Sequence, residues 1–408
     1  MRHKVIIIGH GYTSRLGIIR SLAEMDCDIT VIAMTFHSLL GRMIRLEGKP
    51  IDGYSKYASR VLYSPFQDSD SLISLLIKKC SDPMQKPIII PDSDFSAAII
   101  DRYQNQLNEY FLFPHINHHP GAVEYWMDKI NQKELAREVG LRVVTGAIVE
   151  VSDNKYIFPD SVKYPCFTKA LATVSGGKQF LRKCGNADEL KRVLDKVAMR
   201  FDTKVLVEEY KCIHKEYAVV GFSNGQDVII PGVIEFVDNC KSHFGIAREG
   251  KVIPLNGFES IVKLFKVFIC KIGFSGLFDI DFYEADGEFY FSELNLRLGG
   301  SGYAITRMGV NLPVMLVNYL LGKEDTKSYS LTVQDTSSFV NERMCLDDYV
   351  AGYLDEKELW SIINSYPIKF IFDEIDTAPF VKFKRYCYYQ RFNRFRHAFK
   401  KRIKRLYK

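Results

Sequence analysis

Residues 279–301, DIDFYEADGEFYFSELNLRLGGS, constrain the fold of this chain more than any other stretch. Apolar residues alternate with Asp279 and Asp281, the turn sequence Ala-Asp-Gly follows, and aromatic residues resume after it. This pattern predicts two antiparallel strands joined by a tight turn. Because alternate residues of a strand face the same side, Asp279 shares a face with Asp281, and Glu293 shares one with Asn295.

The polar side chains of this hairpin suit a site for Mg²⁺ and phosphate. Asp281 and Glu293 both lie about six residues from the centre of the turn, so strand pairing brings them near each other. Carboxylate and amide oxygens on rigid strands are ligands that Mg²⁺ prefers. Arg297 follows, and the glycine-rich turn at 299–302 lets backbone approach an anion closely. A surface hairpin with solvated acids is the alternative, but it does not explain why Glu, Asn, Arg and glycine cluster here.

The charge of the chain is unevenly distributed. Of its 55 Lys and Arg residues, 12 lie in residues 382–408, which contain no Asp or Glu. The rest of the chain has 43 basic and 49 acidic side chains, a net charge of −6. This mildly acidic body argues against a nucleic-acid-binding face, and any contact with a polyanion or a membrane is expected in the tail.

Other features of the whole sequence favour a protein of the reducing cytoplasm. At 408 residues the chain is long enough for about two or three domains. Its nine cysteines are scattered and contain no C-x-x-C pair, which disfavours a disulfide framework or a zinc site. The first residues, MRHKVIIIGHGY, are typical of a strand rather than a signal peptide. No apolar run approaches the roughly 18 residues that a membrane span requires.

Residues 4–113 alternate short apolar runs with helical patterns. Strands are expected at 5–8, 28–34, 87–90 and 110–113, and helices at 14–25, 69–80 and 95–104. This order predicts a doubly wound α/β unit around a parallel sheet. Its first turn, GHGYTSRLG, lacks the third glycine spacing of a dinucleotide fingerprint, and no acid ends the second strand, so NAD binding is disfavoured.

Asp92, Ser93 and Asp94 follow the third of these strands. Ligands bind at the carboxyl ends of strands in such sheets, so this segment is placed to hold a substrate amine or hydroxyl. Capping of the following helix explains Asp92 or Ser93 alone equally well.

Residues 121–322 contain several weaker signals. Helices are expected at 121–141, 187–199, 258–271 and 311–321, and strands at 143–149, 164–169, 204–209, 214–221, 228–236 and from about 276. Lys169 ends a strand and precedes the loop ALATVSGGK, which suits polyphosphate binding but lacks the spacing of a Walker loop. Glu208, Glu209 and Glu216 lie beside a strand connector whose backbone suits an adenine edge, with solvated acids as the alternative.

Taken in order, these pieces resemble the ATP-grasp superfamily over about residues 121–322. The matching segments are Asp128-Lys129, Lys169 with SGGK at 175–178, VLVEEY, Glu216, FDIDF and SELNLRLGGS. Residues 1–120 resemble the pre-ATP-grasp domain of D-aspartate ligases and related carboxylate–amine ligases, through VIIIGHGYTSRLGIIRSL, SKYASR and IIPDSD. Carbamoyl-phosphate-synthetase-like enzymes share this architecture.

The resemblance implies a fold class and domain boundaries. The expected fold is α/β and α+β, with a doubly wound pre-ATP-grasp domain at 1–120 followed by an ATP-grasp domain at 121–330. A lid subdomain is expected at about 142–212 of the latter. A C-terminal extension at 331–381 would pack on the ATP-grasp core, and a basic tail would follow at 382–408.

The resemblance also implies roles for individual residues. The ATP-binding set is Lys129, Lys169, Ser175, Gly176, Gly177, Glu208, Glu209, Tyr210, Lys211 and Glu216. The metal set is Asp281, Glu293 and Asn295, for Mg²⁺ with Mn²⁺ as a substitute. The catalytic pair is Arg297 with Lys169, and the substrate-binding set is Gly11, Asp92, Asp94, Gly300 and Ser301.

The function implied is an ADP-forming carboxylate–amine ligase that works through an acyl phosphate. It would join an amino acid, or a similar amine or carboxylate, to a lipid- or nucleotide-linked precursor of the cell envelope or of a surface polysaccharide. A carbamoyl-phosphate-synthetase-like or dipeptide synthetase is one alternative, and a non-catalytic ATP-binding scaffold or sensor is another. No nucleic-acid partner is expected, and a homodimer is one assembly that the sequence allows.

The C-terminal tail has the pattern of an amphipathic helix. Its apolar and aromatic residues at 388–406 recur every three or four positions, with Lys and Arg between them. Such a helix suits peripheral contact with an anionic membrane surface, where each basic residue contributes roughly 1 kcal/mol. A terminal helix docked on the body is the alternative, and RNA binding is disfavoured by the acidic body.

Overall fold

The computed structural model describes residues 2–35, 49–65, 68–160, 162–170, 181–200, 202–243, 245–323 and 331–390. The chain divides into two compact units. Unit 1 comprises Met1–Glu124, Ala218–Asp279 and Asn295–Lys408, and unit 2 comprises Tyr125–Tyr217 and Ile280–Leu294. The domain boundaries expected at 120, 330 and 381 remain predictions.

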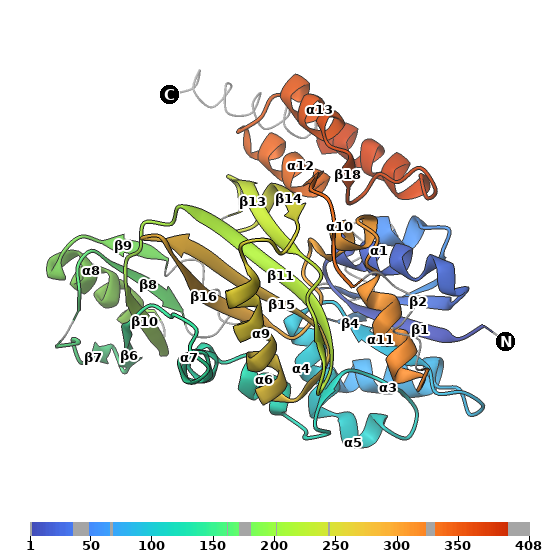
Figure 1. The fold of residues 1–408 in the computed structure, drawn as a ribbon, viewed down its shortest axis with the longest axis horizontal. Helices are drawn as coiled ribbons and strands as arrows, with labels where there is room; N and C mark the ends of the chain where they lie inside the picture. Colours follow the sequence, from blue (N-terminus) through green and yellow to red (C-terminus); the bar gives the residue numbers. More distant parts are fainter. Residues whose placement is uncertain are drawn as a thin grey trace, which may run out of the picture. The chain divides into compact units, whose positions relative to one another are not determined.

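Unit 1 begins with a parallel sheet whose strand order is β3-β2-β1-β4 (Figure 1). The strands are β1 (Lys4–Gly9), β2 (Asp28–Thr35), β3 (Ala58–Pro65) and β4 (Ile88–Pro91), and the helices between and after them are α1 (Tyr12–Ser21), α3 (Ser69–Cys80), α4 (Asp94–Arg102) and α5 (Gln104–Leu107). Val5 and Ile7 of β1 pack into one hydrophobic cluster, and Ile6 and Ile8 into another. Both faces of the sheet are therefore covered, which confirms the doubly wound fold.

Two predicted elements of this region are wrong. The strand expected at 110–113 is reduced to a single bridge between Leu112 and Ile88. The fourth strand is instead β3, an edge strand whose side chains are largely exposed or half-buried, so its apolar pattern is weak. The helix expected at 14–25 ends at Ser21 and continues as a 3-10 turn at Ala23–Met25.

A nine-stranded mixed sheet contains the remaining strands of unit 1. Its order is β16-β15-β11-β13-β14-β17-β18, with β12 added beside β11 and β5 beside β15. The strands are β5 (His115–Ile116), β11 (Lys215–Asn224), β12 (Val228–Ile229), β13 (Val233–Asn239), β14 (Ala247–Ile253), β15 (Phe274–Ala285), β16 (Glu288–Asn295), β17 (Ser337–Val340) and β18 (Ile368–Lys369). The boundary between the units falls within β11, β15 and β16. The strand expected at 228–236 is split into β12 and β13, and β14 was not anticipated.

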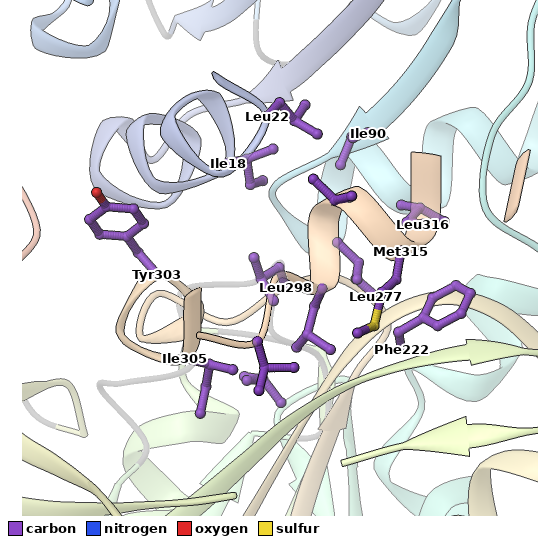
Figure 2. Close-up of a cluster of buried hydrophobic side chains, with 14 of the residues drawn as sticks. Ile18, Leu22, Ile90, Phe222, Leu277, Leu298, Tyr303, Ile305, Met315 and Leu316 are labelled. Carbon is purple, nitrogen blue, oxygen red and sulfur yellow. The ribbon is translucent and has the colours of Figure 1, made fainter. Parts of the chain in front are cut away.

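The core of unit 1 lies between α1, the helices α10 (Gly302–Arg307) and α11 (Leu312–Leu320), and the strands beneath them. Figure 2 shows Ile18 of α1, and Leu22 just after this helix, above Met315 of α11, with Phe222 and Leu277 of the large sheet below. Each such buried side chain stabilises the fold by about 1.5–3 kcal/mol. Helix α9 (Glu259–Ile272) contributes an apolar face at the positions expected for residues 258–271.

Two buried charges hold the C-terminal part of unit 1. The Glu342 carboxylate accepts hydrogen bonds from the backbone N–H groups of residues 370, 371 and 372. The Arg20 guanidinium donates to the carbonyls of residues 370, 371 and 376 and to the Asp376 carboxylate. This segment connects α12 (Glu342–Ala351) and α13 (Glu356–Ser365) to a helix at 378–390. The rest of the predicted tail helix, 391–406, lies outside the described residues.

Unit 2 is built on an antiparallel sheet in the order β7-β6-β10-β8-β9. Its strands are β6 (Gly146–Ser152), β7 (Lys155–Tyr156), β8 (Cys166–Ala170), β9 (Arg182–Cys184) and β10 (Thr203–Glu209), and α8 (Ala187–Ala198) covers one face. The single helix expected at 121–141 is two helices, α6 (Ala122–Trp126) and α7 (Lys129–Glu138). The break occurs because Asp128 has an extended backbone and caps α7 by accepting from the Ile130 N–H.

The hairpin predicted within residues 279–301 is present in the structure. Strands β15 and β16 are neighbours in the sheet, and only Asp286 and Gly287 separate them. Both of these residues have positive φ, 55° and 75°, as a two-residue hairpin turn requires. Among the described residues, no helix is both long enough and apolar enough to cross a bilayer.

Candidate active site

Three lysines and two glutamates form a connected cluster in unit 2. Lys129 Nζ donates to Glu293 Oε2 at 3.1 Å. Lys169 Nζ lies 3.0 Å from Glu208 Oε2, and Lys133 Nζ contacts the other oxygen of the same carboxylate. When all three lysines are protonated, the cluster has one net positive charge, which favours binding of a polyanion.

Regular elements position each member of this cluster. Lys129 is the first residue of α7, and Lys133 follows one helical turn later, on the same face. Lys169 on β8 lies opposite Leu206 of β10, so Glu208, two residues further along β10, faces the same side. With Glu293 on β16, the cluster therefore rests on one helix and three strands rather than on loops.

Gln132 fastens the helix of this cluster to the strand of Glu293. Its side chain is fully buried, donates to the carbonyls of Leu294 and Trp126 at 2.8 Å each, and accepts from the Leu294 N–H at 2.9 Å. These bonds hold the start of α7 beside the end of β16, where Lys129 meets Glu293. Gln132 was not singled out from the sequence, because its contacts reach 162 residues along the chain.

Burial lowers the pKa values of two lysines in the cluster. Desolvation is the main cause for Lys133, followed by the charges of Lys169 and Lys129, and its pKa falls to about 7. Desolvation and the charge of Lys129 lower the pKa of Lys169 to about 8, against the opposing effect of Glu293. Because the lysines repel one another, an anion bound among them would relieve that repulsion.

The other residues predicted to bind ATP have varied surroundings. Lys211 Nζ lies 3.3 Å from Glu209 and 3.1 Å from Asp286, and Lys183 Nζ lies 3.8 Å from the centre of the Tyr210 ring. The backbone N–H groups of Glu209 and Tyr210 already donate to residues 145 and 165. Glu216 is half-buried on β11. Ser175, Gly176 and Gly177 lie outside the described residues.

The residues predicted to hold metal come from both units. Asp281 on β15 and Glu293 on β16 belong to unit 2, whereas Asn295, which is buried, belongs to unit 1. Among the described residues, no group of three or more His, Cys, Asp or Glu side chains is placed to hold a metal ion. Mg²⁺ commonly uses only one or two carboxylates together with substrate phosphates, so two acids on neighbouring strands fit it.

Arg297 of unit 1 is held between two acids. Its Nε donates to Asp94 Oδ1 at 2.9 Å, and its Nη1 lies 3.7 Å from Asp279 Oδ2. Asp94 is the first residue of α4, so the ion pair joins segments 203 residues apart. A Cβ on Gly299 would collide with Asp279 Oδ2, so the Asp279 carboxylate packs directly against the Gly299 backbone. Gly300 is exposed and Ser301 half-buried at the start of α10.

Asp92, at the end of the parallel sheet, is buried beneath the first turn of the chain. Its Oδ2 accepts from Ser14 Oγ at 3.1 Å and lies 3.8 Å from Arg15 Nη1. Its Oδ1 has no hydrogen-bond partner among the described residues, and a Cβ on Gly9 would collide with it. Burial is the main reason that the pKa of Asp92 rises, to about 7, although Arg15 opposes the shift.

Arg15 is itself buried and paired mainly with another acid. Its Nε donates to Asp52 Oδ2 at 2.7 Å, and its Nη1 donates to the Gly9 carbonyl at 2.5 Å. Arg15 and Asp52 were not singled out from the sequence. The signal that could have indicated a buried ion pair is an arginine directly before the apolar residues 16–19 of a helical segment. Gly11 precedes α1 with an extended backbone, and its carbonyl accepts from Ser14 Oγ at 3.2 Å.

Comparison with known proteins identifies the fold that presents these groups. Residues 128–328 match the family model for the carbamoyl-phosphate synthase L chain, ATP binding domain. Residues 128–328 therefore form a domain of the ATP-grasp superfamily. The resemblance inferred from the order of the motifs is thereby confirmed, and so is the predicted fold class.

Proteins of similar sequence include ligases. A D-aspartate ligase of Enterococcus faecium is 23% identical over 325 residues, which are 71% of this chain and 74% of the relative. A carbamoyl phosphate synthase large chain of Gemmatimonas aurantiaca is 22% identical, but the matched segment spans 19% of that protein.

Solved structures show the same fold at lower identity. The biotin carboxylase domain dimer of Hydrogenobacter thermophilus 2-oxoglutarate carboxylase, in complex with MgADP and bicarbonate, has a TM-score of 0.63 and 18% identity. It covers 83% of this chain and 74% of its own. An L-amino acid ligase of Bacillus licheniformis has a TM-score of 0.60 and 14% identity, with 83% and 79% covered.

Proposed function

We propose that this ATP-grasp protein is an ATP-dependent carboxylate–amine ligase that forms ADP and phosphate through an acyl phosphate. The observation that supports the proposal best is the cluster of Lys129, Lys133, Lys169, Glu208 and Glu293, which concentrates cationic groups on rigid elements of unit 2. Similarity to a D-aspartate ligase and an L-amino acid ligase supports the choice of reaction.

In this proposal, unit 2 binds the nucleotide. Lys129 and Lys169 exchange their glutamate partners for phosphate oxygens of ATP, and Ser175, Gly176 and Gly177 of the sequence SGGK bind the same nucleotide. Glu208, Glu209, Tyr210 and Lys211 flank the adenine, and Glu216 the ribose. Asp281, Glu293 and Asn295 would hold Mg²⁺, or Mn²⁺ in its place, and the bound metal would neutralise phosphate charge.

In this proposal, unit 1 binds the carboxylate and the amine that the enzyme joins. Arg297 binds the carboxylate that accepts phosphate, because a guanidinium pairs with carboxylate and phosphoryl oxygens in the same geometry. Asp92 and Asp94 hold the amine, with Gly11, Gly300 and Ser301 lining the backbone around it. Three acids, Asp52, Asp94 and Asp279, face two arginines here, and the buried Asp92, whose pKa is about 7, adds a partial fourth charge. This excess of negative charge favours a cationic amine.

The reaction asks little covalent chemistry of the protein. A substrate carboxylate oxygen attacks the γ-phosphorus of ATP, and ADP leaves. The amine then attacks the acyl carbon, the C–N bond forms, phosphate leaves with the acyl–oxygen electron pair, and the amine releases a proton. Arg297 and Lys169 stabilise the charge that develops on the transferred phosphoryl group, and enclosure of the site excludes water.

The proposed product is a cell-envelope or surface-polysaccharide precursor that has gained an amino acid or a similar group. The similarity to a D-aspartate ligase supports this, and so does the basic tail at 382–408, which suits an anionic membrane surface beside a lipid-linked acceptor. A cytoplasmic enzyme at the inner face of the membrane fits the proposal. Carbamoyl-phosphate-synthetase-like or dipeptide synthesis, and ATP binding without turnover, are the competing functions.

Phosphate release from Mg·ATP tests the proposal. The purified chain is assayed with pooled amino acids, with and without an extract of envelope precursors. Release that depends on one amino acid and on the extract is expected. Tight ATP binding without release in any pool would refute the ligase and favour the scaffold, whereas release with amino acids alone would favour a dipeptide synthetase.

Two variants separate catalysis from binding. Glu293→Gln removes a proposed Mg²⁺ ligand and is expected to reduce phosphate release about 100-fold while ATP binding is retained. Glu288→Gln on the same strand is the matched control, because Glu288 is exposed and pairs with Arg142. Equal activity in the two variants would contradict the assignment of Glu293.

A further inference from the structure

Lys133 is the member of the unit 2 cluster to which neither the motifs nor the proposed reaction gives a role. It lies in the middle of α7, and its side chain is only 10% exposed. Its ammonium contacts Glu208 Oε1, while Lys169 Nζ lies 3.0 Å from Oε2 of the same carboxylate. Glu208, 3% exposed, therefore binds one cation through each oxygen.

We propose that Lys133 is a positioning residue for the nucleotide: it stays paired with Glu208 and so allows Lys169 to leave for the phosphates of ATP. This inference rests on the proposed function, because it assumes that Lys169 binds ATP. It assigns Lys133 no contact with ATP.

The argument follows from the energetics of a buried carboxylate. Within the described residues, Lys133 and Lys169 are the two cations in contact with Glu208. A buried charge left without a partner is strongly destabilising, because burial removes its hydration. If Lys169 were the sole partner of Glu208, its transfer to phosphate would strand that carboxylate. With Lys133 in place, the transfer leaves Glu208 paired.

The two lysines differ in burial, which allows Lys133 to stay on Glu208 while Lys169 leaves for the ligand. The Lys133 side chain is held between α7 and β10, whereas Lys169, the penultimate residue of β8, has a side chain that is 30% exposed. The more buried lysine is suited to a fixed pair, and the more exposed one to exchange with a ligand. A purely structural ion pair is the competing interpretation, in which Lys133 supports the fold and leaves nucleotide affinity unchanged.

A double-mutant cycle on the full chain distinguishes the two, with Mg·ATP binding measured by calorimetry. Lys133→Met removes the counter-ion and is expected to weaken Mg·ATP binding at least about tenfold, the size of a lost charge-assisted hydrogen bond. Glu208→Gln removes the charge that retains Lys169. In that background Lys133→Met is expected to change the affinity less than about threefold, so the coupling between the two sites is large.

Two further variants serve as controls. Lys133→Arg keeps a cation on Glu208 and is expected to bind Mg·ATP within about threefold of the parent chain. Lys191→Met removes an exposed lysine of α8 that pairs with Asp195, and it is expected to leave binding unchanged. Thermal melting of each variant reports folding. If the Lys133→Met variant does not fold, the inference is tested by two other affinities: that of Lys133→Arg against the parent chain, and that of Lys133→Met against Lys133 in the Glu208→Gln background.

Three outcomes overturn the inference. Unchanged affinity of a folded Lys133→Met variant shows a structural pair only. An equal loss of affinity in both backgrounds shows that Lys133 does not act through Glu208. Absence of Mg·ATP binding by the parent chain refutes the proposed function as well, whereas the first two outcomes leave that function intact.

Discussion

Asp92 offers a direct test of how burial shapes the proposed substrate site. The side chain is buried and one of its oxygens has no partner among the described residues, so its ionised form is poorly compensated. Its pKa rises from 3.8 to about 7. We predict that Asp92→Asn stabilises the protein at pH 8 and stabilises it much less at pH 4.5.

The sign follows from proton linkage. The folded state holds this proton more tightly than the unfolded state, so raising the pH from about 4 to 7 favours unfolding. Above pH 7 both states are ionised, and a pKa difference of about three corresponds to about 4 kcal/mol at roughly 1.4 kcal/mol per pH unit. About 3 kcal/mol of this loss develops between pH 4.5 and 8. Asparagine does not titrate, so the variant escapes that loss.

Denaturant unfolding measures the difference in unit 1. The chain has two tryptophans, Trp126 in unit 2 and Trp360 in unit 1, so a Trp126→Phe background leaves Trp360 as the reporter. Other titrating groups are common to parent and variant, and their effects cancel. Asp82→Asn is the control: hydrogen bonds lower the pKa of Asp82, chiefly the one from Lys4, so this variant is expected to gain nothing as the pH rises.

A gain from Asp92→Asn that is equal at pH 4.5 and 8 would refute the reasoning. It would show that Arg15, 3.8 Å away, keeps the Asp92 carboxylate ionised across this range despite burial. The predicted gain in stability is expected to be accompanied by a loss of function, because a residue that destabilises the fold at neutral pH is expected to be needed for substrate binding. The same variant is therefore expected to bind the amine substrate more weakly.

Three further perturbations have defined outcomes. Gln132→Leu removes the bonds that join α7 to β16 and is expected to lower the free energy of unfolding of unit 2 by about 2–4 kcal/mol and to weaken Mg·ATP binding; unchanged melting would contradict the role of Gln132. Asp94→Asn releases Arg297, so KM for the carboxylate substrate is expected to fall while KM for the amine rises; a parallel rise in both would count against separate sites. Glu342→Leu leaves the N–H groups of residues 370–372 unpaired and is expected to lower the stability of unit 1 by about 3–5 kcal/mol, measured by Trp360 fluorescence during denaturation.

Local pattern determined much of the architecture of this protein. The hairpin of β15 and β16 was predicted from strand alternation and an Asp-Gly turn, and α3 was predicted at residues 69–80, where it lies. Such features depend on neighbours a few residues away, because turn chemistry and apolar periodicity act within one element. The weakly patterned edge strand β3 was missed, since most of its side chains are exposed or half-buried and solvent contact selects no residue type.

The order of short motifs along the chain was enough to indicate the ATP-grasp superfamily, and the predicted roles of Lys169, Asp281, Glu293 and Arg297 remain proposals. Tertiary structure alone decided which charges meet. Lys133 reaches Glu208 from a different element, and Arg297 reaches Asp94 across 203 residues. Only packing determines which of these side chains lose their water, and burial, not residue type, sets the altered pKa values of Asp92 and Lys133.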